Sequence, residues 1–378
     1  MKKIQMVDLK SQYAFIRNEV QASIEEVLDT TSYINGPAVK SFQEDLQEYL
    51  GVKHVIPCAN GTDALQIALM GLKLKPGDEV ITADFTFAAT VEVISLLQLK
   101  PVLVDVDSKT FNIDPALIEA AITPKTKAII PVHLFGQIAD MDAINSIAKK
   151  HNLYVVEDNA QGIGARYGSV NDIKTMTGTL GHVAATSFFP SKNLGAYGDG
   201  GAIITNDDDL AHFIRGIVNH GMYERYYHDV VGVNSRLDSI QAAVLKVKLK
   251  YLDFYNERRK EASIRYTNLL SNHPNIITPH RKLACDSHVF HQYTLRIINA
   301  DRDALVAYLN THDIPCGVYY PVPLHRQKAY ADPEVNEASF PVTNQLVKEV
   351  ISLPMHSELT TDQIAFISGK VLSFLKEN

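Results

Sequence analysis

The chain has 378 residues, of which 46% are hydrophobic, and its 36 Lys and Arg residues stand against 43 Asp and Glu residues, for a net charge of −7. A chain of this length is expected to form about two domains with a large core. Because neither sign of charge is clustered, the composition offers no basic surface for nucleic acid or for an anionic membrane. Small molecules are therefore the expected ligands.

The cysteines and the amino-terminal segment bear on the compartment. Cys58, Cys285 and Cys316 are far apart and odd in number, which is typical of neither a disulfide framework nor a metal site. We therefore expect no metal ion and a reducing compartment. The first residues turn polar before any apolar stretch forms, so we expect no signal peptide and no membrane anchor. The expected location is the cytoplasm.

Apolar, strand-like runs alternate with helical periodicity through the first part of the chain. This rhythm predicts a parallel sheet covered by helices, and the continuous aliphatic runs are typical of strands buried on both faces. The expected strands are His54–Ala59, Glu79–Ala83, Pro101–Val106, Ala128–Leu134, Tyr154–Glu157 and Thr186–Phe189. The expected helices are Asp63–Leu72, Thr86–Leu97, Pro115–Ile122 and Met141–Lys150.

The pattern changes after about Tyr251, where a charged helical stretch leads into a mixture of shorter elements. There we expect strands at Phe290–Ile297 and Cys316–Tyr319 and helices at Arg302–Asn310 and Thr361–Leu375. The chain is accordingly divided into a large α/β domain, residues 1–250, and a smaller α+β domain, residues 251–378.

One lysine follows the strand predicted at Thr186–Phe189. Pro190 ends that strand, so Lys192 would leave the sheet edge beside phenylalanine rings. Desolvation at such a place favours the neutral amine, which is the form that attacks carbonyl groups. A solvated loop lysine fits the same local sequence, because most lysines lie at the surface. Residues elsewhere in the chain have to distinguish the two.

Ligands of open α/β sheets bind at the carboxyl ends of the strands, and three further features stand there. Gly61 and Thr62 begin a helix, whose free backbone N–H groups suit a phosphate, although a plain helix cap would look the same. Glu157 and Asp158 end a buried strand, where a carboxylate needs a cation. A protonated pyridine nitrogen or a structural salt bridge would both satisfy that need. Ser187 could add a contact to the phosphate.

Together, a phosphate cup, an acid after a later strand and a lysine after a further strand match the parts of a pyridoxal 5'-phosphate enzyme. The same segments, read in order and nearly end to end, closely resemble the DegT/DnrJ/EryC1/StrS family of nucleotide-sugar aminotransferases. The matching segments are Tyr33–Pro37, Ala59–Leu65, Glu157–Gln161, Ser187–Gly195, Gly198–Gly201, Asn234–Asp238 and Tyr320–His325.

The resemblance implies the aspartate aminotransferase fold (pyridoxal phosphate fold type I) and a homodimer with active sites at the subunit interface. It implies that Lys192 binds the aldehyde of the cofactor, that Asp158 pairs with the ring nitrogen and that Gln161 lies near the ring. The other cofactor contacts it implies are Gly61, Thr62, Asp63 and Ser187 at the phosphate, Phe87 stacked on the ring, and Asn234 from the other subunit.

The resemblance also implies the reaction. An amino donor, expected to be glutamate, gives its amino group to a keto group on a nucleotide-linked sugar, usually for cell-surface polysaccharide. The motifs look most like the branch that acts on UDP-2-acetamido-2-deoxy-3-oxoglucuronate, for which Arg236 would pair with the sugar carboxylate. A structural arginine bridged to Asp238 is the alternative. That branch often has His-Tyr-Pro where this chain has Tyr319, Tyr320 and Pro321.

Two alternatives stay open at this point. Within the family, the substrate could be a dTDP-linked 3-keto-6-deoxyhexose or a 4-keto sugar, contacted by Tyr319, Tyr320 and His325. Outside catalysis, the chain could bind the cofactor and act as a regulator. The intact Lys192 and Asp158 favour catalysis, and the sequence has no basic stripe for a DNA-binding output.

Overall fold

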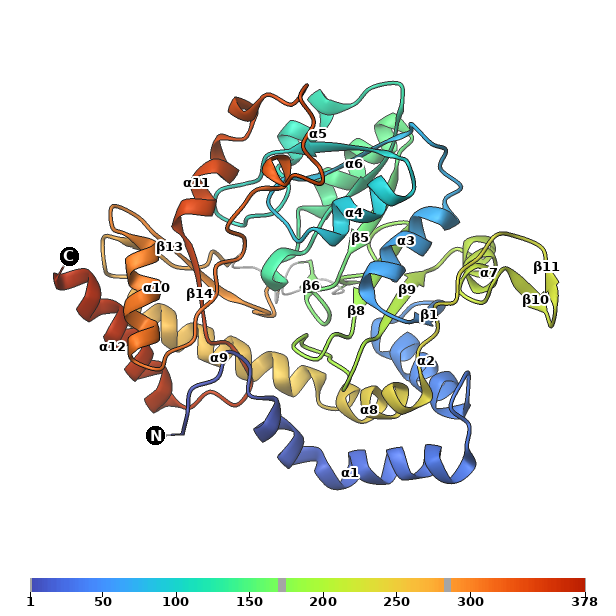
Figure 1. The fold of residues 1–378 in the computed structure, drawn as a ribbon, viewed down its shortest axis with the longest axis horizontal. Coiled ribbons are helices and arrows are strands. Elements are labelled where there is room, and N and C mark those ends of the chain that lie inside the picture. Colours follow the sequence, from blue (N-terminus) through green and yellow to red (C-terminus); the bar gives the residue numbers. More distant parts are fainter. Residues whose placement is uncertain (1, 169–174, 282–286, 378) are drawn as a thin grey trace.

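A computed structural model describes residues 2–168, 175–281 and 287–377. In these residues a seven-stranded sheet has the order β1, β9, β8, β5, β4, β2, β3 (Figure 1). Its strands are β1 (His54–Cys58), β2 (Glu79–Ala83), β3 (Lys100–Val104), β4 (Thr126–Ile130), β5 (Tyr154–Asp158), β8 (Val183–Ser187) and β9 (Gly201–Thr205). All neighbouring strands from β8 to β3 are parallel. The mostly parallel sheet is thus confirmed, but β9 runs antiparallel to both β1 and β8.

Helices cover both faces of this sheet. Neighbouring strand residues point into different cores, Val80 toward α3 and α4 and Ile81 toward α6, because side chains alternate along a strand. The helices are α1 (Leu9–Thr30), α2 (Pro37–Leu50), α3 (Gly61–Gly71), α4 (Ala89–Leu96), α5 (Pro115–Ala121), α6 (Met141–His151), α7 (Asp208–Ile217), α8 (Ser239–Leu249), α9 (Leu252–Leu270), α10 (Arg302–Thr311), α11 (Pro341–Glu349) and α12 (Thr361–Glu377), with short 3-10 turns at Leu134–Gly136, Leu324–Arg326 and Glu337–Ser339.

The helix that matters most for the site, α3, begins where the sequence places a cap. The side chain of Asn60 accepts a hydrogen bond from the N–H of Asp63 at 2.8 Å, which satisfies one of the free donors at the helix start. Gly61 has no room for a side chain, because a Cβ there would lie 2.5 Å from the Cβ of Ser187. The start of α3 therefore lies directly against the end of β8.

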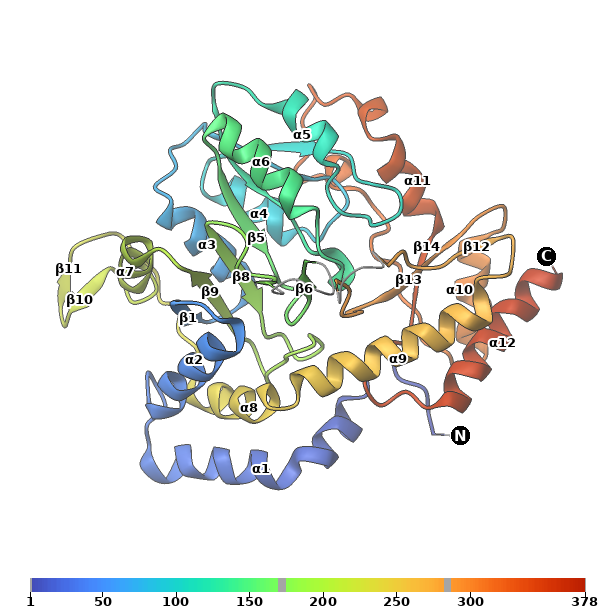
Figure 2. The ribbon, with the colours of Figure 1, turned by 180° about the vertical axis from the view of Figure 1, so that it is seen from behind.

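A smaller sheet belongs to the carboxyl-terminal part, and Figure 2 shows α9 and α12 running beside it. It has the order β12 (Ile276–Ile277), β13 (Tyr293–Ile297), β14 (Val350–Leu353). A second hydrophobic core formed by residues 262–375 surrounds it and takes in Ile4 from the amino terminus. This separate core is consistent with two domains, and the domain boundary between residues 250 and 251 stays a prediction. The remaining strands are β6 (Arg166–Tyr167), β7 (Thr175–Met176), β10 (Met222–Glu224) and β11 (Tyr227–His228).

Several expected strands differ from the structure at their ends. β4 ends at Ile130 and not at Leu134, and β13 begins at Tyr293 and not at Phe290. The strand predicted at Thr186–Phe189 is β8, which begins at the buried Val183 and ends at Ser187, before the phenylalanines. The strand predicted at Cys316–Tyr319 is wrong, since of its residues only Gly317 forms a bridge, to Ser352, while Val318 and Tyr319 line a cavity. An apolar run of four residues cannot distinguish a strand from an extended wall segment.

Cys58 and Cys316 are free thiols, and Cys285 lies outside the described residues. No helix in the described part of the chain is long and apolar enough to cross a membrane.

Candidate active site

A cavity of about 720 Å³ opens at the carboxyl ends of the strands, where ligands of α/β sheets bind. Its wall includes side chains that follow β2, β4, β5 and β8, together with the start of α3 and two segments from the carboxyl-terminal part. Nine of the residues expected at the site line it: Gly61, Thr62, Phe87, Asp158, Gln161, Ser187, Lys192, Tyr319 and Tyr320. One cavity thus brings together the lysine, the acid and the helix start that the sequence keeps far apart.

Lys192 lies in a tight turn after β8. Its N–H donates to the carbonyl of Phe189 at 2.8 Å, and a Cβ at Gly195 would lie 2.4 Å from the carbonyl oxygen of Pro190, so the turn requires glycine there. Burial lowers the pKa of Lys192 to about 8, although the charge of Asp158 opposes this. The neutral amine, which is the nucleophilic and basic form, is therefore reached about two pH units lower than for an ordinary lysine.

Asp158 is the last residue of β5, and its side chain is almost fully buried. Its Oδ2 accepts a hydrogen bond from Thr90 Oγ1 at 2.8 Å, and its Oδ1 accepts one from the N–H of Ala160 at 3.2 Å. Burial raises the pKa of Asp158, and these bonds and the charge of Lys192 oppose the rise. Each oxygen has a remaining lone pair, so the carboxylate can still accept a bond from a cationic ring nitrogen.

The start of α3 offers an anion site. Thr62 and Gly61 line the cavity, and no hydrogen bond from their N–H groups to another described residue occupies those donors. Ser187 lies directly against Gly61, with its hydroxyl on the same wall. The free donors and the positive end of the helix dipole together favour a phosphate group here.

Aromatic rings and an amide form the rest of the wall. Gln161 Oε1 accepts the N–H of Phe135 at 2.7 Å, while its Nε2 donates to the hydroxyl of Tyr320 at 3.3 Å. The hydroxyl proton of Tyr320 is therefore free to donate to a ligand. Phe87 is 56% exposed, and its ring centroid lies 6.2 Å from that of Tyr320. An exposed ring at a cavity is suited to stacking against a flat ligand.

Four residues expected at the site lie outside the cavity wall. The N–H of Asp63 donates to the side chain of Asn60, and the carboxylate of Asp63 accepts a hydrogen bond from the hydroxyl of Ser235 at 2.6 Å. In this structure Asp63 therefore holds Ser235 and makes no contact with the expected phosphate site. Arg236 Nη1 donates to Asn219 Oδ1 at 3.4 Å, and Asn234 pairs with Asn219 through an isolated bridge.

His325 is the fourth of these residues. Its Nδ1 lies 2.7 Å from Asp84 Oδ2, its N–H donates to Asp84 Oδ1 at 2.8 Å, and its ring stacks on Phe340. The expected substrate contact is not supported, because the side chain is buried and held by Asp84. Nothing in the sequence around His325 separates a contact with substrate from a structural contact with a distant acid.

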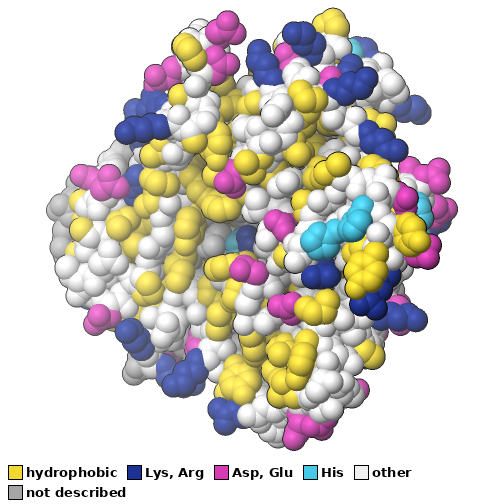
Figure 3. Space-filling view, turned by 45° about the vertical axis from the view of Figure 1, so that its right-hand side comes forward, with side chains coloured by type: hydrophobic (Ala, Val, Ile, Leu, Met, Phe, Trp, Pro, Cys, Tyr) yellow, Lys and Arg dark blue, Asp and Glu magenta, His cyan; other side chains and the backbone are white. Residues whose placement is uncertain are grey.

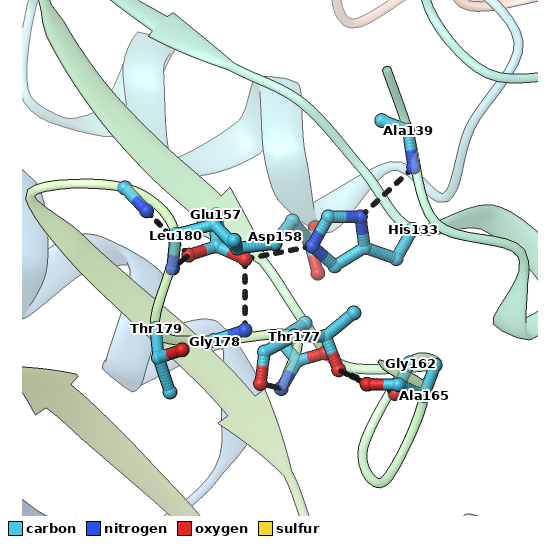
Figure 4. Close-up of polar contacts among 12 residues, drawn as sticks. His133, Ala139, Glu157, Asp158, Gly162, Ala165, Thr177, Gly178, Thr179 and Leu180 are labelled. Atoms are coloured by element: carbon cyan, nitrogen blue, oxygen red, sulfur yellow. Dashed lines mark hydrogen bonds and ion pairs between the residues drawn. The ribbon is translucent and has the colours of Figure 1, made fainter. Parts of the chain in front are cut away.

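Glu157 and Asp158 are neighbours but face opposite sides of the sheet, and Figure 4 shows the side of Glu157. The carboxylate of Glu157 accepts three backbone N–H groups, from Gly178, Leu180 and Gly181, at 2.6–2.8 Å. His133 Nε2 is 2.9 Å from it, and His133 Nδ1 accepts the N–H of Ala139. His133 thus donates its Nε2–H to Glu157. Four donors satisfy this carboxylate, so the cation expected to face one of the two acids is needed only by Asp158.

Several residues of the site were missed from the sequence. Thr90 orients Asp158 from a helix far earlier in the chain, and Thr86 lines the cavity with a buried hydroxyl that has no hydrogen-bond partner in the described residues. His291 lines the cavity from the carboxyl-terminal part. In the sequence, only Thr86 could have been recognised as a site residue, because it stands shortly after a predicted strand. No feature of the sequence indicates that Thr90 or His291 belongs to the site.

Pyridoxal 5'-phosphate fits these residues, because the wall has free N–H donors for a phosphate, a carboxylate with spare lone pairs and an amine of lowered pKa. When bound, this cofactor withdraws electrons from the carbon beside the transferred nitrogen. The α3 start and Ser187 would hold its phosphate, and Asp158 would hold a proton at its ring nitrogen. Lys192 would hold its aldehyde and, once released, move a proton at the reacting carbon. No cluster of three metal-binding side chains occurs in the described residues.

Comparison with known proteins agrees with this geometry. Residues 14–372 match the model of the DegT/DnrJ/EryC1/StrS aminotransferase family. The chain belongs to this family. It is 48% identical over 364 residues, which are 96% of this chain and 98% of the relative, to a Pseudomonas aeruginosa protein named UDP-2-acetamido-2-deoxy-3-oxo-D-glucuronate aminotransferase. It is also 48% identical over 375 residues, which are 99% of each chain, to a Geobacillus stearothermophilus protein named pleiotropic regulatory protein.

A solved structure of a DegT/DnrJ/EryC1/StrS aminotransferase from Brucella abortus is similar over nearly the whole chain, with a TM-score of 0.93, 42% identity and coverage of 98% of this chain and 99% of the other. Membership of the family confirms the expected fold, the aminotransferase class and the pyridoxal 5'-phosphate cofactor.

Proposed function

We propose that this aminotransferase transfers the amino group of L-glutamate to the 3-keto carbon of UDP-2-acetamido-2-deoxy-3-oxoglucuronate, in the cytoplasm, for cell-surface polysaccharide. The observation that carries the proposal is the 48% identity, over 96% of this chain, to the relative named for that substrate. A cavity that contains Lys192, Asp158 and the free start of α3 supports it, because these groups match the three parts of the cofactor.

The test separates the two halves of the reaction. The purified protein, loaded with pyridoxal 5'-phosphate, should lose its visible absorbance when L-glutamate is added, and the resulting amine form should then aminate one of a panel of UDP- and dTDP-linked keto sugars. Mass spectrometry of the product identifies the sugar. Conversion by glutamate followed by amination of dTDP sugars alone would contradict the proposed substrate but not the reaction class.

A second substrate class is favoured by the charges on the cavity wall. Among the described residues that line it, Lys192 is the one cation, and Arg236 is turned to Asn219. The hydroxyls of Tyr319 and Tyr320 suit an uncharged sugar, such as a dTDP-linked 3-keto-6-deoxyhexose or a 4-keto sugar. Arg236→Ala distinguishes the classes: it should raise KM for a uronate far more than for its uncharged analogue if the arginine binds the carboxylate, and equal effects remove that role.

A regulatory function is the candidate from another class, and the printed name of the Geobacillus relative favours it. The lowered pKa of Lys192, which shares a cavity with Asp158, supports catalysis instead. Lys192→Ala should abolish turnover while cofactor still binds, as measured by its absorbance after gel filtration. A wild-type protein that keeps its visible band with every common amino donor would support the regulator.

The active form is proposed to be a homodimer with shared sites, to which Asn234 of one subunit contributes at the cavity of the other. The segment from β10 to residue 231 projects from the body in Figures 1 and 2, and it exposes 74% of Tyr226 and 88% of Val231. Figure 3 shows a further face on which apolar side chains gather around a hollow. Exposed apolar surface of this kind is typical of an interface.

Sedimentation measures the oligomeric state, and complementation tests whether the sites are shared. Lys192→Ala and Asn234→Ala should each lose activity. Because a mixed dimer would have one site with both residues intact, mixing the two variants under exchange conditions should restore activity. Mixed dimers that stay inactive would show that each site is built by one subunit.

A further inference from the structure

His291 lies on the cavity wall without a role in the site described above. It precedes β13 in the carboxyl-terminal part of the chain, yet it lines the same cavity as Lys192. Its side chain is 6% exposed, so the ring is part of the packed wall and not a mobile surface group. A buried titratable side chain at a ligand cavity needs a physical account, because burial without a partner is unfavourable.

The backbone that carries His291 is fixed from several sides. The buried guanidinium of Arg259 donates to the carbonyls of Phe290, at 3.1 Å, and His291, at 3.3 Å. Asn193, next to Lys192, donates to the carbonyl of Val289 at 3.0 Å. The lysine turn and the His291 segment are thus linked directly, and the position of the imidazole relative to the cavity is set before any ligand binds.

The two ring nitrogens of His291 differ in their surroundings. Nδ1 is sealed from solvent and has no hydrogen-bond partner in the described residues. Nε2 is not sealed in this way, and because His291 lines the cavity we take Nε2 as the nitrogen that faces it. A proton on the sealed Nδ1 would be a buried N–H without an acceptor, which is rarer in proteins than a buried nitrogen with an unused lone pair. We therefore place the proton on Nε2. The imidazole therefore presents an N–H donor to the cavity.

The charges around His291 are positive. Burial lowers the pKa of His291 well below its usual value, and the charges of Lys192 and Arg259 lower it further. The ring is therefore neutral. An anion bound next to Nε2 would accept its hydrogen and would be attracted by the charge of Arg259.

The proposed function leaves several anions without a binding group, and the α-carboxylate of the amino donor is the one attached to the reacting carbon. The start of α3 and Ser187 suit the phosphate, and Asp158 suits the ring nitrogen, but the α-carboxylate of the amino donor still needs a donor near Lys192. We propose that His291 binds this α-carboxylate through Nε2–H during the first half of the reaction. The assignment rests on the proposed function, since it requires an α-amino acid as amino donor.

The test compares L-glutamate with 4-aminobutyrate, which lacks the α-carboxylate but keeps the amine and the distal carboxylate. Both are titrated calorimetrically into full-length Lys192→Ala protein loaded with pyridoxal 5'-phosphate, which cannot turn over. Adding His291→Phe should weaken glutamate binding about tenfold, because a hydrogen bond to a charged group is lost, and should leave 4-aminobutyrate unchanged. His291→Gln, which keeps an N–H donor, should restore most of the affinity for glutamate.

A matched control uses His288, which is buried and stacked on Phe290 at 3.8 Å between ring centroids but does not line the main cavity. His288→Phe should lower thermal stability without changing the preference for glutamate. Equal losses for glutamate and 4-aminobutyrate in His291→Phe, or unchanged binding of both, would overturn the assignment.

Kinetics with Lys192 intact give a second measurement that does not depend on the alanine variant. In His291→Phe the KM for glutamate should rise about tenfold, while the KM for the keto sugar changes less than twofold. A rise confined to the sugar would contradict the carboxylate role. If the wild-type protein accepts no amino donor at all, the proposed function fails, whereas a converting wild type with an unaffected His291→Phe variant refutes only this assignment.

Discussion

Glu157 and Asp158 are adjacent buried carboxylates at the end of one strand, and their surroundings are opposite. Glu157 faces the far side of the sheet, where His133 and three backbone N–H groups satisfy it. Asp158 faces the cavity with one donor on each oxygen and capacity to spare. A buried acid is thus a mark of function only where its hydrogen bonding is incomplete and a ligand can reach it.

The largest expected effect is on catalysis at the cavity side. Asp158→Asn removes the charge that would keep the cofactor ring nitrogen protonated, so kcat/KM should fall by about 10³-fold while the melting temperature changes little. Steady-state kinetics and calorimetric unfolding measure the two quantities. A variant with wild-type kcat/KM would remove Asp158 from the mechanism.

The neighbouring substitution should act on stability instead. Glu157→Gln places an amide NH₂ against N–H donors that now have no acceptor, so the free energy of unfolding should fall by about 3 kcal/mol. Denaturant titration measures the loss. A Glu157→Gln variant that is as stable as the wild type but inactive when folded would contradict the assignment of Glu157 to stability and Asp158 to catalysis.

A smaller effect is expected from the donor that orients Asp158. Thr90→Val keeps the shape but removes the hydrogen bond to Oδ2, so the pKa of Asp158 should rise and kcat/KM should fall about tenfold. Thr82→Val is the matched control, because Thr82 Oγ1 donates at 2.9 Å to the carbonyl of Ile130 in the same sheet. Equal losses in activity would show that the effect is only structural.

The smallest effect is a dependence on pH. Because the pKa of Lys192 is about 8 without cofactor, the neutral amine becomes the main form only above that value. The rate at which cofactor-free protein captures pyridoxal 5'-phosphate, followed by visible absorbance, should therefore rise with pH through about 8 and then level off. A rate independent of pH across this range would show that the amine is already neutral.

The residues that were correctly predicted to lie at the cavity belong to short local motifs. Gly61 and Thr62 begin a helix after a strand, and Lys192 and Ser187 belong to one strand and turn, so short segments bring these groups to the same sheet edge. His325 and Arg236 lie in motifs of similar character, but their partners Asp84 and Asn219 hold them away from the cavity. Nothing in the local sequence reports those distant partners.

The sequence by itself predicted the helix-covered sheet and the family, and it marked Lys192 and the start of α3 as candidates for the cofactor site, because motifs and periodicities can be read along the chain. The tertiary structure decided which of two adjacent acids stays available and brought His291 to the wall beside Lys192. Those outcomes depend on loops and helices that pack from far away in sequence, through Thr90, Arg259 and the turn at Gly178 to Gly181. Hydrogen bonds of this kind form only once the cores have packed, so no periodicity or motif can report them.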